Sequence, residues 1–358
     1  MNAKERVLAA ISHRQPDCIP FSLGFGVNPP VRKQLALLLG LQDEHAVEQY
    51  LNSKSDLVWV APPYIGPSER NIKNADGSET DIWGVSRRAV SYGEGSYDEI
   101  CHYPLAEIED VSELDDYLFP DPDWFDYAAL PEIIRQTQEE CPRAVVLGNA
   151  NIFESSWYMR GLENMMIDLL VDPELADAIL ERVTNFFYEF MKRCLEAAQG
   201  GIDIIFTADD IGQQNGLLMS LDTWREHIKP HHQRINELVH SYHAKVMYHT
   251  DGAVMEAVGE LIDMGIDVLE ALQFDAQGMD PCVLKKQYGD RLCFHGGISV
   301  QSTLPFGTPE EVTKEVEQRI AVLGENGGYI LAPSHAIQAG TPPENVLAFF
   351  RAASRPLK

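Results

Sequence analysis

The sequence predicts an α/β fold, a (β/α)8 TIM barrel with an insertion after the second strand. Short apolar runs of strand length recur along the chain, and helical segments lie between them. Such continuous apolar runs are typical of parallel strands that are buried on both faces. Eight strand-helix units need roughly 250 residues, which leaves about 100 for insertions. An open doubly wound sheet is the alternative, but no glycine-rich nucleotide loop follows a strand.

The predicted strands are the apolar runs at 18–25, 56–62, 144–150, 202–208, 245–249, 267–272, 292–296 and 328–333. The last five are the clearest, because a polar turn and then an amphipathic stretch follow each run. The main predicted helices cover 1–14, 173–199, 221–242, 253–264, 309–323 and 343–354. Pro173, Pro309 and Pro343 stand near helix starts, where a missing N–H costs least.

One long segment, at about 63–130, does not fit the strand-helix alternation. Apolar residues such as Val90 and Tyr92 alternate with polar ones beside glycines, which indicates a hairpin. An acidic, proline-containing connector follows and ends near Trp124. We therefore expect a single barrel domain over 1–358 that carries an inserted hairpin and connector.

The charge of the chain limits the partners that it can attract. Lys and Arg total 28 against 55 Asp and Glu, a formal net charge of -27. Such a surface repels nucleic acid and anionic membranes, and it disfavours a polyanionic substrate unless a local basic pocket overrides it. The sequence has no apolar stretch of bilayer length and no secretory signal, and its 6 cysteines are scattered. We expect a soluble protein of the reducing cytoplasm.

Two strand-like runs end in side chains that commonly bind metals. The run 245–249 delivers His249 and then Asp251, and the run 328–333 delivers His335 soon after it. Imidazole, carboxylate and imidazole can hold a divalent transition metal and leave a coordination position open. A lone histidine at a strand end is more often only a hydrogen-bonded residue. The combination of the three predicts a metal site.

Other polar residues also follow the apolar runs, on the face where TIM barrels place their active sites. They are Asn149, Asn151, Glu154, Asp209, Asp210, Glu270, Gln273 and His295. Each is also explained as a helix cap or a stabilising hydrogen bond, and this holds above all for Asp209 and Asp210. Their convergence on one face is what indicates a catalytic site.

Several motifs, spread over nearly the whole chain, occur together in one known family. They are Arg6–Ala10, Asp81–Gly84, Arg160–Glu163, Asp209–Gly212, His249–Gly252, Phe294–Ile298 and Gly327–His335. The chain resembles the uroporphyrinogen decarboxylase superfamily, and within it the corrinoid-dependent methyltransferases and their bacterial relatives. The resemblance implies a TIM barrel with its site at the C-terminal ends of the strands.

The methyltransferase branch is known for a zinc ion held by a His-x-Cys pair and a later Cys. Here His249 matches the histidine, Asp251 stands where the first cysteine would be, and His335 stands near the second. Carboxylate and imidazole make a harder ligand set than thiolates. This departure leaves three alternatives: weakened zinc binding, another divalent ion, or no metal.

The resemblance implies a methyltransferase that moves a methyl group between a small methylated metabolite or acceptor and a separate corrinoid protein. The methyl-corrinoid would arrive on that partner, and a divalent metal, zinc foremost, would act as a Lewis acid. The residues assigned to catalysis are Glu154, Asp210 and His295. The residues assigned to substrate binding are Asn149, Asp209, Gln273 and Arg160. The oligomeric state is left open, a homodimer included.

Two other functions stay open. The first is a uroporphyrinogen decarboxylase-like or other metal-dependent lyase that acts on a small carboxylated substrate. Decarboxylases of this family share an Arg-rich N-terminal motif for their substrate's carboxylates, whereas residues 21–26 contain no arginine here. The second is a module that binds a tetrapyrrole or corrinoid protein and has lost its chemistry.

Overall fold

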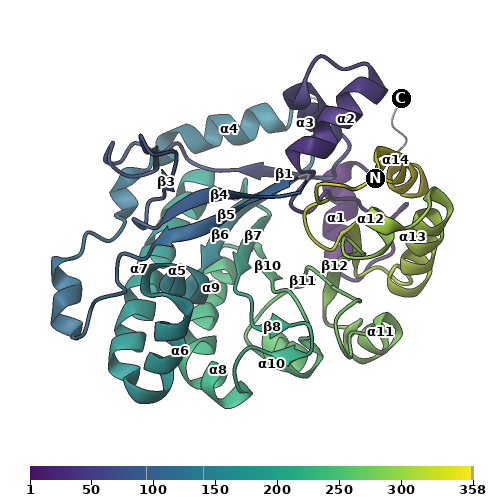
Figure 1. The fold of residues 1–358 in the computed structure, drawn as a ribbon. Helices are drawn as coiled ribbons and strands as arrows, with labels where there is room; N and C mark the ends of the chain where they lie inside the picture. Colours follow the sequence, from purple (N-terminus) through teal and green to yellow (C-terminus); the bar gives the residue numbers. More distant parts are fainter. Residues whose placement is uncertain (94, 140, 356–358) are drawn as a thin grey trace.

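The computed structural model describes residues 1–93, 95–139 and 141–355. Within them, the main sheet has seven parallel strands in the order β1-β6-β7-β10-β11-β12-β13 (Figure 1). The strands are β1 (Leu57–Val60), β6 (Ala144–Asn151), β7 (Ile204–Ala208), β10 (Lys245–His249), β11 (Val268–Glu270), β12 (Cys293–Ile298) and β13 (Tyr329–Pro333). Seven of the eight predicted strands are therefore confirmed, and they form one curled sheet.

The first predicted strand, 18–25, is reduced to a short link between the two edges of this sheet. Phe21 makes a parallel bridge to Leu331 of β13. The N–H of Asp56, just before β1, donates to the carbonyl of Phe21 at 2.8 Å. Pro20 has no N–H to donate to a strand ladder, so a longer regular strand is disfavoured here.

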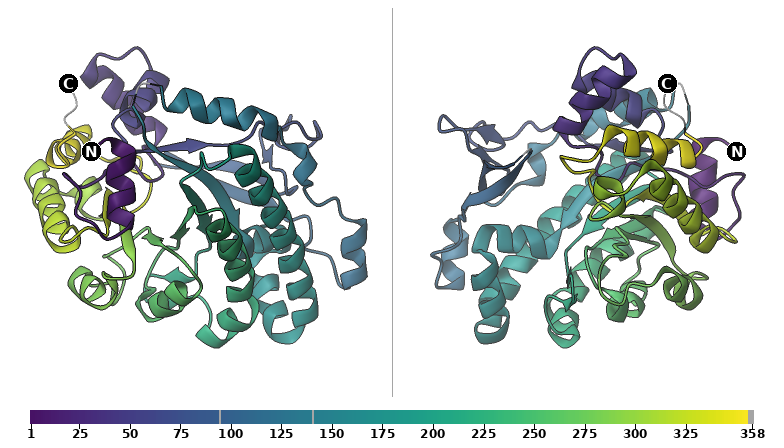
Figure 2. Two further views of the ribbon diagram at one scale, coloured as in Figure 1. Left: turned by 180° about the vertical axis from the view of Figure 1, so that it is seen from behind. Right: turned by 45° about the vertical axis from the view of Figure 1, so that its right-hand side comes forward.

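Helices cover the outer face of the sheet (Figures 1 and 2). The α-helices are α1 (Ala3–Ile11), α2 (Pro29–Leu39), α3 (Glu44–Asn52), α4 (Leu130–Thr137), α5 (Ile152–Arg160), α6 (Leu162–Val171), α7 (Pro173–Ala198), α8 (Leu221–His227), α9 (Lys229–Ser241), α10 (Val258–Asp263), α11 (Pro281–Tyr288), α12 (Thr303–Phe306), α13 (Pro309–Leu323) and α14 (Pro343–Ala352). The prediction of a single helix over 221–242 is wrong. It is divided at Ile228, because Pro230 cannot donate the hydrogen bond that a continuous helix needs.

Apolar side chains pack on both faces of the sheet in separate clusters. The smaller cluster, called here the inner cluster, consists of Val7, Ala10, Ile11, Leu57, Ala144, Val146, Ile204, Phe206, Ala208, Met247, Val268, Cys293 and Ile330. Its strand members alternate with residues of the larger cluster between sheet and helices, as the two-residue period of a strand requires. The inner cluster fills the space enclosed by the curled sheet, and α1 contributes to it.

The segment predicted as a hairpin and connector forms a separate antiparallel sheet. Its order is β2-β3-β4-β5 within the described chain. The strands are β2 (Ile72–Lys73), β3 (Glu79–Thr80), β4 (Ser86–Tyr92) and β5 (Gly95–His102). Strands β4 and β5 pair antiparallel, and they extend away from the main sheet in the right-hand view of Figure 2. Strand β1 nevertheless pairs directly with β6, so the main sheet is continuous across this segment.

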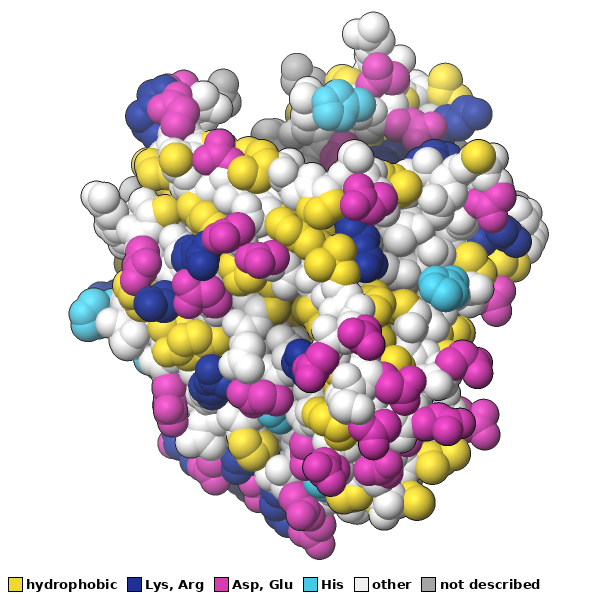
Figure 3. Space-filling model, turned by 90° about the vertical axis from the view of Figure 1, so that its left-hand side faces the viewer, with side chains coloured by type: hydrophobic (Ala, Val, Ile, Leu, Met, Phe, Trp, Pro, Cys, Tyr) yellow, Lys and Arg dark blue, Asp and Glu magenta, His cyan; other side chains and the backbone are white. Residues whose placement is uncertain are grey.

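The remaining elements are short. They are the 3-10 helices η1 (Val111–Asp116), η2 (Pro122–Trp124), η3 (Tyr127–Ala129) and η4 (Met255–Ala257), and the strand pair β8 (Gly212–Gln213) and β9 (Gly216–Leu217). Acidic side chains are spread over the face shown in Figure 3, with Lys and Arg between them. None of the described helices is both long and apolar enough to cross a membrane.

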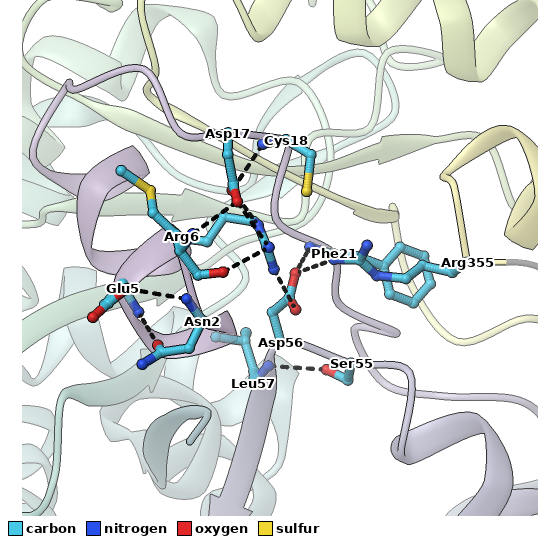
Figure 4. Close-up of polar contacts among 11 residues, drawn as sticks. Asn2, Glu5, Arg6, Asp17, Cys18, Phe21, Ser55, Asp56, Leu57 and Arg355 are labelled. Atoms are coloured by element: carbon cyan, nitrogen blue, oxygen red, sulfur yellow. Dashed lines mark hydrogen bonds and ion pairs between the residues drawn. The ribbon is translucent and has the colours of Figure 1, made fainter. Parts of the chain in front are cut away.

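A buried carboxylate ties the two ends of the chain to the start of β1 (Figure 4). Asp56 forms ion pairs with Arg6 of α1 at 3.3 Å and with Arg355 at 2.6 Å. It also accepts the N–H of Phe21 at 2.9 Å. Because the Asp56 side chain is only 6% exposed, these contacts lie where water screens charges weakly.

We expect Asp56→Ala to lower the free energy of unfolding by about 3 kcal/mol, because it leaves two arginines and a backbone N–H without their shared acceptor. Urea denaturation followed by circular dichroism measures the loss. The control is Asp17→Ala, which removes another partner of Arg6 that is 45% exposed. A smaller loss is expected there. Equal losses for both variants would contradict the role of Asp56.

Candidate active site

The candidate site lies at the C-terminal ends of the central strands. His249 is the last residue of β10 and pairs in register with Ala208 of β7 and Glu270 of β11. Met247 and Val268, two residues earlier on β10 and β11, belong to the inner cluster. Because alternate side chains of a strand share a face, His249 and Glu270 point into the space that the sheet encloses.

Three predicted metal ligands, His249, Asp251 and His335, come together here. One ligand atom of each lies within 4.8 Å of the others. Asp251 follows the end of β10 by two residues, and His335 follows the end of β13 by two. Asp251 Oδ1 is buried and has no hydrogen-bond partner among the described residues. These donors fit a divalent transition metal and would leave coordination positions open.

A carboxylate on the neighbouring strand orients the first of these histidines. Glu270 accepts a hydrogen bond from His249 Nδ1, and the exposed fraction of its side chain is 1%. The other ring nitrogen, Nε2, then faces Asp210 Oδ1 at 3.6 Å and Asp251 Oδ1 at 3.8 Å. Metal-binding histidines usually donate their second ring N–H to a carboxylate in this way. The arrangement therefore prepares Nε2 for a cation.

The pKa values of His249 and Asp251 show the effect of the carboxylates that surround them. Burial alone would lower the pKa of His249, but the charge and hydrogen bond of Glu270 raise it to about 10. Burial raises the pKa of Asp251 to about 7. The carboxylates around the His249 imidazole stabilise its protonated, positively charged form. A bound metal cation would supply positive charge at the same place and would displace that proton.

His295 extends the site along β12. Its side chain is buried, and neither ring nitrogen has a hydrogen-bond partner within the described residues. His295 Nδ1 lies 3.6 Å from Glu270 Oε1, an atom that also has no partner there. Buried polar atoms in native proteins are nearly always satisfied by protein, water or a ligand. The two atoms nevertheless face each other as an ion pair, so Glu270 contacts both His249 and His295.

Glu154 lies in the first turn of α5, directly after β6. It accepts hydrogen bonds from Asn151 Nδ2 at 2.5 Å and from the Tyr158 hydroxyl at 2.9 Å. Burial, with help from the charges of Asp209 and Asp210, raises the pKa of Glu154 to about 7. A carboxyl group that titrates near neutral pH can both give and take a proton, as a general acid or base must.

Asp209 has a structural role that differs from its predicted contact with substrate. Its side chain is fully buried and accepts the N–H groups of Phe153 and Glu154, each at 2.8 Å. It also contacts His232 Nε2 at 2.5 Å. Asp209 thus satisfies two of the free N–H groups at the start of α5, where the helix dipole favours a negative charge. It positions Glu154, and a contact between Asp209 and a substrate stays a prediction.

Arg160 is likewise placed away from the predicted substrate. It lies at the other end of α5, where it forms a buried ion pair with Asp168 at 2.7 Å. It also donates to the carbonyls of Leu105 and Ile108, at 2.8 and 2.7 Å. Its hydrogen-bonding capacity therefore holds the connector to α5 and α6. A contact between Arg160 and a substrate stays a prediction.

The other predicted residues line the loops around the candidate metal ligands His249, Asp251 and His335. Asp210 accepts the N–H of Asp251 at 2.7 Å, and Gln273 accepts the N–H of Gly252 at 3.0 Å. Both contacts fix the loop after β10 and the direction of the Asp251 side chain. Asn149, at the end of β6, is exposed and borders a groove.

Sequence reasoning missed three aromatic side chains and one histidine. Phe25 lies with its ring centroid 4.9 Å from the rings of both His249 and His335. Phe206 and Trp59 continue this aromatic contact, with their ring centroids 5.2 Å apart. Trp59 and Phe206 lie inside predicted strands, where apolar residues are expected for packing alone, so the sequence gave little signal of a role at the site. His232, the partner of Asp209, lies in the first turn of α9 and far from any strand end, so it gave no signal.

Comparison with known proteins identifies the family. The model of the uroporphyrinogen decarboxylase (URO-D) family matches residues 88–356. The chain belongs to this family. A methylated-thiol–coenzyme M methyltransferase of Methanosarcina mazei is 29% identical over 200 residues, 56% of this chain and 50% of that protein. A uroporphyrinogen decarboxylase of Pseudoalteromonas atlantica is 25% identical over 159 residues, 41% of this chain and 42% of that protein.

The chain thus spans about half the length of the curated relatives that it matches. A solved structure titled as a methyltransferase from Methanosarcina mazei superimposes with a TM-score of 0.70 at 20% identity, covering 99% of this chain and 98% of that chain. This similarity extends over the whole α/β fold of the family. It supports the TIM-barrel-like architecture that the sequence predicts.

The raised pKa of Glu154 predicts a pH-dependent stability. The folded state holds the Glu154 proton up to about pH 7, whereas the unfolded chain releases it near 4.5. The contribution to stability is full below pH 4.5 and is lost as pH rises through 7, an effect of about 3 kcal/mol. We therefore expect Glu154→Gln to gain stability over the natural protein between pH 5 and 8 in urea denaturation.

The control for this experiment is Glu163→Gln, which changes an exposed glutamate of α6. It should follow the pH dependence of the natural protein. A stability difference between Glu154→Gln and the natural protein that stays constant from pH 5 to 8 would contradict the raised pKa.

Proposed function

We propose that the chain is a metal-dependent methyltransferase that moves a methyl group between a small methylated metabolite or acceptor and the cobalt of a separate corrinoid protein. The observation that carries this proposal is the convergence of His249, Asp251 and His335 at the strand ends of a URO-D family fold. Support for methyl transfer comes from the relative named as a methyltransferase of methylated thiols and coenzyme M. The metal is a divalent ion, with zinc as the first candidate.

The three ligands would hold the metal, which acts as a Lewis acid on the substrate heteroatom. Glu270 keeps His249 Nε2 directed at that position. The bond between the methyl carbon and the heteroatom breaks, its electron pair stays on the heteroatom, and cobalt(I) of the partner supplies the pair for the new bond to carbon. Where the released group is basic, Glu154 can supply its proton. Asn149, Gln273 and His295 are the candidates for hydrogen bonds to the substrate.

A decarboxylase or other lyase acting on a carboxylated substrate is the second candidate, because two relatives are named as uroporphyrinogen decarboxylases. The charge of the site argues against it. Glu154, Asp210, Asp251 and Glu270 surround the site, and among the described residues no Lys or Arg is ion-paired with any of them. A carboxylated substrate needs cationic partners to offset its desolvation.

Two features of the wider molecule belong to the same proposal. Residues 63–130 are an insertion within a single domain, since β1 and β6 pair directly across them. The partner supplies the methyl-corrinoid, and the reaction takes place in the cytoplasm.

We expect the purified protein to bind one equivalent of a divalent metal, measured by inductively coupled plasma mass spectrometry after equilibration with Zn²⁺. His249→Ala and Asp251→Ala each remove a ligand and should lower the affinity by at least about tenfold. His243→Asn is the matched control, because His243 is an exposed histidine outside the site. Undiminished metal content in both ligand variants would overturn the assignment of these residues.

The same variants test the reaction. The metal-loaded protein is mixed with cob(I)alamin and a panel of methylated thiols, methoxylated compounds and methylamines, and methylcobalamin formation is followed by absorbance. We expect transfer from at least one class of donor, at least about a hundredfold slower in Asp251→Ala and unchanged in His243→Asn. Absence of transfer from every donor, with the metal bound, would contradict the proposed function.

A further inference from the structure

The inserted antiparallel sheet contacts the helix that carries Glu154. Arg87 of β4 lies over the ring of Tyr158 of α5, with its guanidinium carbon 4.8 Å from the ring centroid. The Tyr158 hydroxyl donates to Glu154 Oε1 at 2.9 Å. Tyr158 and Glu154 are four residues apart, and side chains at this spacing lie on the same face of a helix. A continuous row of contacts therefore runs from the insertion to the carboxyl group.

The turn before β4 determines where the Arg87 side chain lies. Arg87 Nη1 donates to Asp81 Oδ2 at 2.6 Å. The other oxygen of Asp81 accepts the N–H groups of Trp83 and Val85, at 2.9 and 3.1 Å. Because both oxygens are bound, the carboxylate keeps one orientation and directs the guanidinium. The contact of Arg87 with Tyr158 is thus built into the insertion.

An aromatic side chain anchors this turn on α7. Trp83 is buried, and its ring centroid lies 5.0 Å from that of Phe186 and 5.4 Å from that of Phe187. The Trp83 carbonyl also accepts the hydroxyl of Tyr117 in the connector. Aromatic pairs of this kind stabilise packing beyond the area that they bury. The start of β4 is therefore fixed on the main body of the protein, and so is Arg87.

Both oxygens of the Glu154 carboxyl group accept hydrogen bonds, one from Tyr158 and one from Asn151 Nδ2. A protonated carboxyl group must use one oxygen as a donor, so these two contacts favour the ionised form. Burial and the negative charges of Asp209 and Asp210 favour the protonated form, and they raise the pKa of Glu154 to about 7. The charged and titratable groups that face Glu154, directly or through one neighbour, are Asp209, Asp210, His232, Tyr158 and Arg87.

The Tyr158 hydroxyl is a constant donor in this arrangement. Burial raises the pKa of Tyr158 far above its usual value, so the hydroxyl keeps its proton. The positive charge of Arg87 attracts the face of the ring and holds the ring in place. It also polarises the O–H bond towards Glu154, as each member of a hydrogen-bonded chain polarises the next. Loss of either contact would weaken the hydrogen bond to the carboxylate.

We propose that Arg87 is a positioning residue for proton transfer, and that it acts through Tyr158 to hold a hydrogen-bond donor on Glu154. This inference rests on the proposed function, in which Glu154 supplies the proton to a basic released group. The O–H bond of Glu154 breaks, its proton moves to the released heteroatom, and its electron pair stays on the carboxylate. Tyr158 and Asn151 then stabilise that carboxylate, and the Tyr158 proton does not move. The insertion thus supports the ionised state of the acid.

Infrared spectroscopy tests the proposal without a substrate, because the C=O band of a protonated carboxyl group disappears when the group ionises. Each spectrum is corrected with that of the same protein carrying Glu154→Gln, so that the remaining signal belongs to Glu154. Tyr158→Phe removes only the hydroxyl. We expect the pH at which Glu154 is half-protonated to rise by about one to two units. An unchanged midpoint in Tyr158→Phe would overturn the proposal.

The role of Arg87 is tested in the same titration. Arg87→Met should raise the midpoint by about half a unit, and Arg87→Lys, which keeps the positive charge, should restore part of the difference. Arg88→Met is the matched control, because Arg88 is the next residue of β4 and forms its own ion pair with Asp76 at 2.6 Å. Its midpoint should equal that of the natural protein. A purely structural role would change stability alone, so an unmoved midpoint in Arg87→Met would overturn the assignment of Arg87.

The two proposals fail in different ways. If the midpoint moves as expected while no donor yields methylcobalamin, the contacts of Arg87, Tyr158 and Glu154 stand and the proposed reaction is wrong. If methylcobalamin forms while the midpoint is the same in Tyr158→Phe, Arg87→Met and the natural protein, the positioning role is wrong and the methyltransferase proposal stands.

Discussion

The hydrogen bond between His249 and Glu270 connects two neighbouring strands at the centre of the site. Both side chains are buried at the ends of strands that pair in register, so the contact is set by the sheet itself. A buried imidazole and carboxylate are costly alone and are stable as a hydrogen-bonded pair. Their contact turns the free nitrogen of His249 towards Asp210 and Asp251. The candidate metal position depends on that direction.

A second buried pair supports the other side of the site. Asp209 joins His232 of α9 to the first turn of α5, and that turn carries Glu154. The helix α5 therefore begins at a point determined by the carboxylate that directly follows β7. Sites held on rigid strands and helix starts keep their geometry better than sites on loops. The two pairs thus hold Glu154 and His249 in place at the C-terminal ends of β6 and β10.

The site has a polar side and an apolar side. Its polar side is acidic, and its apolar side consists of the contacting rings of Phe25, Phe206 and Trp59. Acidic groups that lack basic partners cost stability, as the raised pKa values of Glu154 and Asp251 indicate. A metal cation bound between His249, Asp251 and His335 would relieve that cost. The replacement of thiolates by Asp251 and His335 is consistent with a site made for hard, positively charged ligands.

The sequence by itself determined the strands, the strand ends and the order in which polar residues follow them. A parallel strand buried on both faces must be apolar throughout, so its end is visible where His249 or His335 appears. The spacing of His249 and Asp251 likewise placed both side chains at one strand end. Only the tertiary structure decided the partners. Asp209 caps α5, Arg160 pairs with Asp168, and Phe25 reaches His249, because these contacts depend on strand register and helix position across distant segments. The local order of apolar and polar residues does not determine such contacts, because they form only when distant segments pack together.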